Sequence, residues 1–353
     1  MDAFARWPEQ EGAKRLLRAA LRDGPAHAYL LHGPPGVGKR AFALAFAGEL
    51  LGDAARVERR AHPDLYVLEP LGDQIRIDAI RALRRDLHMR PFEAARRVYL
   101  VLGADRMNDD AADALLKDLE EPPAYAVLVL VADELGQLPE TIRSRCQHVP
   151  FRRLSERAVR EWLAGQAPEL GEAERTALAR VAGGRLDRAS RLLDPAGAAR
   201  REALVDVARS VYRDPAFEPA DAADRVLAGV RATGAAAREA AEQTLDGLDL
   251  PTREAEQRVR RAQFGAEREE LLANLEELAA WYRDLVVAAA GAPDAVIHFD
   301  RLDDVRADAT RERMLGAERA SEEVRDVWRA YEEFNLNPGL ALDALFVRVH
   351  REF

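Results

Sequence analysis

A glycine-rich segment near the N-terminus constrains the fold of this chain more than any other feature. Residues 33–39 match the pattern G-x-x-x-x-G-K, and the next residue is Arg40. In loops of this kind backbone N–H groups cradle phosphate, the lysine reaches the terminal phosphates, and a hydroxyl after the lysine holds Mg²⁺. Arginine offers no acceptor to a metal ion and repels it. The segment therefore predicts a nucleotide-binding fold that has lost hydrolysis and binds phosphate at most. The candidate contacts are Gly33, Gly36, Gly38, Lys39 and Arg40.

The neighbouring sequence supplies the strand and the helix that such a loop requires. A short apolar run ends at His32, and apolar residues recur at helical spacing from Arg40 to Leu51. Continuous apolar runs of this kind are typical of strands buried on both faces of a parallel sheet. The alternation predicts a doubly wound α/β domain. The expected strands cover residues 28–32, 65–68, 98–102 and 127–131, and the expected helices cover 11–22, 40–51, 77–87 and 109–121, the last one capped by Asn108.

After Phe151 the sequence becomes helical throughout. A small helical unit over 155–194 is interrupted by Gly183 and Gly184, and alanine-rich helices follow. The clearest of these covers 269–290, and the last begins with Asn337 as its cap and Pro338 at its first position. Linkers are expected near 213–220 and 291–309. The predicted domains are a nucleotide-binding-like domain at 1–152, a helical domain at 153–212 and a second helical domain at 213–353.

Composition narrows the class of protein. The chain has 353 residues, and its net charge of −10 argues against a protein that coats DNA by itself. Its single cysteine, Cys146, allows no disulfide and no zinc site of several cysteines within the chain, which fits a reducing cytoplasm. The charged N-terminus predicts no signal peptide, and the absence of an 18-residue apolar run predicts no membrane span. We expect a cytoplasmic protein without a bound metal.

The acidic residues that a hydrolase of this fold needs are missing from their strand end. Hydrolysis requires a carboxylate pair directly after an apolar strand, one for the Mg²⁺ shell and one for the attacking water. Here the two positions hold Leu102 and Gly103, and Asp105 lies too far along the chain. We expect Asp105 to be a turn or capping residue in preference to a metal ligand.

Two arginines follow a proline in the segment Thr141-Ile142-Arg143-Ser144-Arg145-Cys146. Pro139 can open a short helix that presents Arg143 and Arg145 from a rigid element. A guanidinium suits a terminal phosphate, because its N–H groups match the phosphate oxygens bidentately. The alternative is that both arginines are solvated surface charges.

These segments together resemble the bacterial clamp-loader subunits of the AAA+ family. The resemblance rests on LLKDLEEPP at 115–123 and on Ser144-Arg145-Cys146, and it is strong over 24–154. Phe334-Asn335-Leu336-Asn337-Pro338 is similar to the collar domain of a non-hydrolysing subunit of DNA polymerase III. The family implies an AAA+ domain, a helical lid and a helical collar that forms a hetero-oligomer.

The resemblance also implies specific roles. The chain would be a stator that offers Arg145 in trans to ATP on a neighbouring motor subunit (gamma/tau), with Ser144 and Cys146 shaping the loop. Its partners would be the motor and delta subunits, and it would reach the sliding clamp and primer-template DNA through the complex. No cofactor is expected, although ATP or phosphate without turnover remains open. Many relatives carry a four-cysteine zinc module, for which residues 52–61 have no cysteine.

Two questions stay open at this point. Either Arg185 or Arg188, or neither, takes the nucleotide-sensing role of the lid. The rival function is a catalytically active clamp-loader ATPase that uses Lys39 with an unusual Mg²⁺ arrangement.

Overall fold

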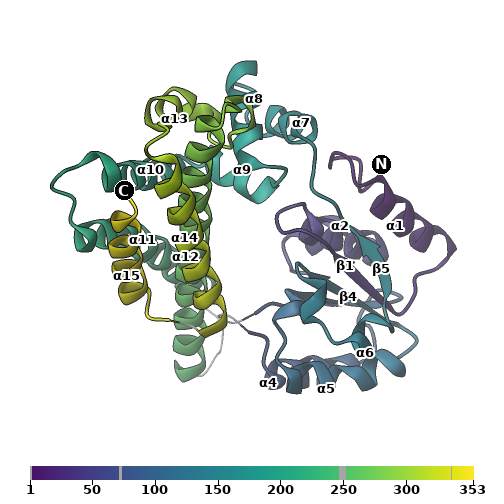
Figure 1. The fold of residues 1–353 in the computed structure, drawn as a ribbon. Helices are drawn as coiled ribbons and strands as arrows, with labels where there is room; N and C mark the ends of the chain where they lie inside the picture. The colour runs from purple at the N-terminus through teal and green to yellow at the C-terminus, as the bar shows by residue number, and fades with distance from the viewer. Residues whose placement is uncertain (1, 71–73, 246–251, 335) are drawn as a thin grey trace. The chain divides into compact units, whose positions relative to one another are not determined.

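The computed structural model describes residues 2–70, 74–245, 252–334 and 336–353, and the chain divides into two compact units (Figure 1). Unit 1 contains the residues up to Pro168 together with Gly183–Arg188. Unit 2 contains Glu169–Ala182 and Ala189–Phe353. The domain boundaries expected at 152 and 212 are not tested by this division and stay a prediction.

A five-stranded parallel sheet forms the centre of unit 1, with the strand order β2-β3-β4-β1-β5. Leu30 of β1 lies opposite Leu130 of β4 on one side and His148 of β5 on the other. All residues of β3 and β4 are buried, as their apolar runs predicted. The predicted α/β fold with its parallel sheet is confirmed. The strands are β1 Ala28–His32, β2 Leu65–Leu68, β3 Arg97–Leu102, β4 Ala126–Ala132 and β5 Gln147–Pro150.

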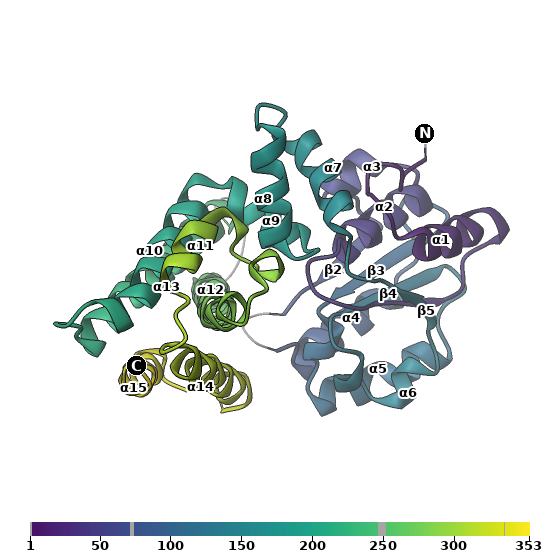
Figure 2. The same ribbon diagram turned by 45° about the horizontal axis from the view of Figure 1, so that its top comes forward.

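Helices cover both faces of this sheet (Figure 2). The α2 side chains Phe42 and Phe46 are fully buried on one face, where Phe46 contacts the ring of Tyr29 edge-on at 5.1 Å. α4 and α5 pack on the other face through a cluster that includes Leu83 and Leu115. The helical elements are α1 Glu11–Asp23, α2 Lys39–Leu51, α3 Ala54–Glu58, α4 Ile77–Leu87, η1 Ala104–Arg106, α5 Asp109–Glu120, η2 Leu135–Gln137, α6 Glu140–Arg143 and α7 Glu156–Gln166.

The described part of unit 2 is helical, as the sequence after Phe151 predicted. Its core surrounds the long helix α12, where Trp281 and Tyr282 are fully buried. Asn337 caps the last helix as predicted, because its side chain accepts a hydrogen bond from the N–H of Leu340 at 3.1 Å. Asn335 lies outside the described residues. The elements are α8 Glu172–Ala182, α9 Leu186–Leu193, which begins in unit 1, α10 Pro195–Arg213, α11 Pro219–Leu245, α12 Thr252–Ala289, η3 Pro293–Ala295, η4 Phe299–Arg301, α13 Leu302–Asp308, α14 Met314–Phe334 and α15 Pro338–Arg351.

The expected linker at 291–309 is in fact part of the core of unit 2. His298 is fully buried, and its ring nitrogens lie 2.8 Å from Asp284 and 3.0 Å from Glu277. Burial by itself lowers the pKa of His298, but the two carboxylates outweigh it and raise the pKa above its ordinary value. Asp308 is also fully buried and accepts a hydrogen bond from Tyr212 at 2.9 Å. Val296 and Val305 of this segment also belong to the apolar core, but two isolated valines among buried polar residues form no apolar run that would reveal its burial.

Candidate functional site

The glycine loop joins β1 to α2 in the conformation that a phosphate cradle requires. β1 ends at His32 and α2 begins at Lys39. Between them, the φ angles are +136° at Gly33, +72° at Gly36 and +95° at Gly38. Residues with a Cβ atom rarely adopt such values, which explains glycine at each position.

Two of these glycines are also required because other parts of unit 1 approach them closely. A Cβ atom at Gly33 would lie 2.3 Å from the backbone oxygen of Phe151. One at Gly36 would lie 1.8 Å from a carboxylate oxygen of Asp187. The N–H of Leu186 donates to the Gly36 oxygen at 2.7 Å. The segment 183–188 therefore contacts the loop directly through Leu186 and Asp187.

Lys39 makes three polar contacts within the protein. Its Nζ donates to the backbone oxygens of Gly33 at 2.6 Å and Pro34 at 2.5 Å. The same atom forms an ion pair with Asp133 at 2.6 Å, and the Lys39 side chain is only 3% exposed. A lysine ammonium has three donors, so these contacts account for all of them. A phosphate would have to displace at least one of these partners to reach Lys39.

Asp105 holds the partner of Lys39 in place. Its carboxylate accepts hydrogen bonds from the N–H groups of Asp133 at 3.0 Å and Glu134 at 2.9 Å, directly after β4. Asp105 therefore has a structural role, but it is not the local turn or capping residue that the sequence predicted, because the N–H groups it binds lie 28 and 29 residues further along the chain. Leu102 is the last residue of β3, and Gly103 follows it with a φ of +71°.

Arg40 faces an acidic residue that follows β2. Its guanidinium forms an ion pair with Glu69, which directly follows β2 and also pairs with Arg60 at 2.8 Å. The position that holds a hydroxyl in a working loop thus carries a cation that shares one carboxylate with Arg60.

The N-terminal segment also packs beside the loop, which the sequence analysis missed. Phe4 and Trp7 are buried, and their rings lie 5.5 Å and 5.0 Å from the ring of Phe42. A Cβ atom at Gly38 would lie 3.9 Å from the indole of Trp7. Two aromatic residues within seven positions, in a chain with only 6% aromatics, were the available signal.

The Ser-Arg-Cys segment follows a short helix, as predicted. Pro139 precedes α6, and the Ser144 hydroxyl donates to the Thr141 oxygen at 3.2 Å. Cys146 is only 8% exposed, and burial raises the pKa of its thiol to about 12. Cys146 is therefore an apolar anchor of the segment at neutral pH and not a reactive thiolate.

Arg145 lies at the surface with two internal contacts. Its Nη1 donates to the Thr141 oxygen at 2.7 Å, and its Nη2 forms an ion pair with Glu120 at the end of α5. The side chain is 33% exposed. The geometry leaves further N–H groups of Arg145 free to bind an anion.

A histidine pair connects this segment to the glycine loop. His148 of β5 lies 3.0 Å from the Arg143 oxygen through Nε2 and 3.3 Å from His32 through Nδ1. Burial, the neighbouring His148 and Lys39 together lower the pKa of His32. The sequence analysis missed this link because it did not predict β5, in which only Val149 is buried.

The segment 183–188 leaves the sensor question open. Arg185 forms an ion pair with Asp187 at 2.9 Å, and the N–H of Arg188 donates to the same carboxylate at 2.8 Å. The side chain that approaches Gly36 of the loop is that of Asp187 and not that of either arginine.

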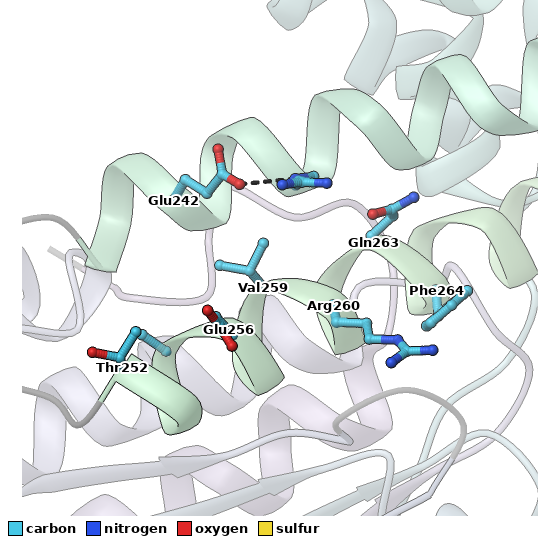
Figure 3. Close-up of a pocket in the computed structure, with 9 residues that line it drawn as sticks. Glu242, Thr252, Glu256, Val259, Arg260, Gln263 and Phe264 are labelled. Atoms are coloured by element: carbon cyan, nitrogen blue, oxygen red, sulfur yellow. Dashed lines mark hydrogen bonds and ion pairs between the residues drawn. The ribbon is translucent and has the colours of Figure 1, made fainter.

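Unit 2 contains a separate cavity of about 510 Å³ between α11 and α12 (Figure 3). Val259 and Phe264 contribute apolar surface, and the guanidinium of Arg260 lies 5.3 Å from the Phe264 ring. Across the cavity, Arg238 pairs with Glu242 at 2.8 Å (Figure 3). The lining of this cavity thus mixes apolar and charged side chains.

Within the described ranges, no helix is sufficiently long and apolar to cross a bilayer. The same ranges contain no cluster of three or more potential metal-ligating side chains. The expected absence of cofactors and zinc stays a prediction.

The N-terminal region is similar to subunits of DNA polymerase III. Residues 9–155 match the family described as DNA polymerase III, delta subunit. The chain is 34% identical over 165 residues to the DNA polymerase III subunit delta' of Bacillus subtilis, a match that covers 43% of this chain and 50% of that protein. It is 39% identical over 159 residues to the delta' subunit of Pseudomonas aeruginosa, covering 41% and 48%. The predicted resemblance is confirmed for this region: residues 9–155 are similar to DNA polymerase III delta' subunits.

The matches to the delta' subunits cover only part of each protein. The chain spans about half the length of the curated delta' relatives it matches. The tau subunit of Bacillus subtilis is also 32% identical over 158 residues, covering 41% of this chain and 28% of tau. Among solved structures, a DNA polymerase III gamma subunit-related protein of Thermotoga maritima aligns with 97% of this chain and 99% of its own, at 19% identity and a TM-score of 0.46.

Proposed function

We propose that this chain is the stator subunit of a DNA polymerase III clamp loader. It assembles with the motor (gamma/tau) and delta subunits and supplies Arg145 to ATP bound by the neighbouring motor. Through that complex it takes part in placing the sliding clamp on primer-template DNA. The relationship of residues 9–155 to delta' subunits supports this proposal.

The observation that carries the stator role is the internal engagement of Lys39. The Lys39 side chain is 3% exposed, and its ammonium contacts Gly33, Pro34 and Asp133. In addition, Arg40 stands at the hydroxyl position, and Leu102 and Gly103 stand at the acid positions. A Mg²⁺-dependent hydrolysis site needs an available lysine, a hydroxyl and a carboxylate pair, so the chain hydrolyses no ATP by itself.

Arg145 supports the second half of the proposal. It follows a short helix, and its backbone is fixed beside the buried side chains Ile142 and Cys146. An arginine supplied in trans to a phosphoryl-transfer site contributes about 10³- to 10⁵-fold in rate.

The C-terminal helices offer the surface for assembly. Several large apolar side chains on α14, on α15 and between them are exposed in the single chain. Burial of such surface against equivalent helices supplies association energy of about 25 cal/mol per Å² before the costs of association. The residues are Leu315, Trp328, Phe334, Leu336, Leu340 and Val347.

The rival function is a catalytically active motor. The retained Lys39 and the match to tau favour it. Steady ATP turnover by the purified single chain that Lys39→Ala abolishes would establish the motor and overturn the stator. Equilibrium dialysis with labelled ATP, with and without Mg²⁺, tests the intermediate case of binding without turnover; we expect no retention of ATP in either condition.

Reconstitution with motor and delta subunits tests the role of Arg145. We expect Arg145→Ala to lower DNA-stimulated ATP turnover of the complex by 10²-fold or more while the complex still assembles. Arg145→Lys keeps the charge without the planar fork and should recover little activity. Arg22→Ala, at an exposed arginine near the end of α1, serves as the matched control. Wild-type turnover in the Arg145→Ala complex would refute the proposed role.

A further inference from the structure

Glu120, the last residue of α5, holds the guanidinium of Arg145 from one side. It belongs to the stretch LLKDLEEPP at 115–123. Its carboxylate pairs with Nη2 of Arg145, while the Thr141 oxygen accepts from Nη1 at 2.7 Å. The Arg145 guanidinium is therefore fixed between the end of α5 and the short helix α6.

The backbone around Arg145 is fixed independently of Glu120. The N–H of Arg145 donates to the Ile142 oxygen at 3.1 Å. The side chain of Ile142 is fully buried and that of Cys146 is 8% exposed. The remaining freedom is in the long side chain of Arg145, which has many rotamers. Glu120 and Thr141 restrict that freedom.

The pair with Glu120 leaves donors available for a phosphate. An arginine has five N–H groups, and the two recorded contacts use one on each terminal nitrogen. Three N–H groups remain, and a bidentate phosphate contact needs two. Arg145 can therefore bind phosphate without leaving Glu120.

We infer that Glu120 is a positioning residue, which holds Arg145 in the orientation that the terminal phosphate on the neighbouring subunit requires. This inference rests on the proposed function of Arg145. The opposite role would be a restraint, in which the Glu120 carboxylate repels the phosphate and keeps Arg145 from it. The side chains of Arg145 and Glu120 are 33% and 48% exposed, so solvent screens the repulsion between the Glu120 carboxylate and the phosphate. The direct hydrogen bond that orients the Arg145 guanidinium is a short-range contact and does not depend on that repulsion.

The test uses the complete reconstituted complex with DNA. Glu120→Ala should lower kcat about three- to fivefold at an unchanged KM for ATP, in keeping with an exposed ion pair of at most about 1 kcal/mol. Glu120→Gln keeps an acceptor without the charge and should lie between Glu120→Ala and the wild type. The double variant Glu120→Ala with Arg145→Ala should be no slower than Arg145→Ala, because Glu120 acts only through Arg145.

Glu121→Ala is the matched control, because Glu121 is the adjacent exposed acid and makes no recorded ion pair within the described residues. Unchanged or faster turnover with Glu120→Ala, in a complex that Arg145→Ala impairs, overturns the positioning role alone. An equal loss in Glu121→Ala, or a loss of assembly on gel filtration, also overturns it. Wild-type turnover with Arg145→Ala overturns the proposed function as well.

Discussion

The glycine loop and the Ser-Arg-Cys segment are two cationic features of the same unit with opposite availability. Lys39 is 3% exposed and directs its ammonium to three internal acceptors, whereas Arg145 is 33% exposed and retains N–H groups for another molecule. The loop carries the more recognisable motif, yet the segment carries the more accessible cation. A phosphate-binding pattern in a sequence thus establishes a backbone shape, while the partners of its charged residue decide what that shape binds.

A substitution that the backbone of the glycine loop cannot accommodate should have the largest effect on stability. Gly33→Ala places a Cβ atom 2.3 Å from a backbone oxygen at a φ of +136°, so neither strain nor clash can be relieved by a side-chain movement. We expect a loss of about 3 kcal/mol in the free energy of unfolding by urea. Gly12→Ala, at a helical position with open space around the new Cβ, should be neutral or slightly stabilising. Equal effects of the two would contradict the tight fit of the loop.

Removal of the lysine charge should have the next largest effect. Lys39→Met leaves Asp133 and two backbone oxygens without their donor, which we expect to cost about 2 kcal/mol in the same measurement. The companion Arg145→Ala breaks an ion pair and a hydrogen bond that are both at the surface, and it should change stability by less than about 1 kcal/mol. If Lys39→Met were as mild as Arg145→Ala, the contrast between the two cations would be lost.

The histidine link between the two regions should give a smaller, pH-dependent effect. The folded-state pKa of His32 is lowered, so below its ordinary value near 6.5 the unfolded chain binds more protons than the folded one. Stability should therefore fall as the pH decreases from about 6.5 through the folded pKa of His32. His32→Gln should flatten this part of the stability curve measured by denaturation at several pH values. If the variant kept the same dependence of the unfolding free energy on pH, His32 would not be the group responsible for it.

The smallest perturbation concerns the anchor beside Arg145. With its pKa raised to about 12 and its side chain buried, native Cys146 should react very slowly with a thiol reagent at pH 8. Labelling should become fast only in unfolding concentrations of urea. Rapid labelling of the native chain would mean that the segment carrying Arg145 is not held by a buried Cys146 as the structure describes.

Much of the architecture could be read from the sequence because it depends on local patterns. The apolar runs at β3 and β4, the cap Asn108 and the glycines of the loop all act within a few residues of themselves. β5 could not be read in the same way, since an edge strand with one buried residue lacks an apolar run. The anchoring of 291–309 was missed for a related reason, because His298 and Asp308 are buried polar residues.

In the candidate site, too, some features follow from local sequence and others depend on tertiary packing. The sequence by itself determined which side chains stand at the metal-binding positions of the loop and the strand end, since Arg40, Leu102 and Gly103 offer no side-chain oxygen to a metal ion. Only the tertiary structure decided what the remaining groups contact. Asp133 meets Lys39 and Asp187 meets Gly36 across separations of roughly one hundred residues or more, and Glu120 reaches Arg145 from another helix. Such contacts depend on how strands and helices pack together, and no local pattern of residue types specifies which charges that packing brings within hydrogen-bonding distance.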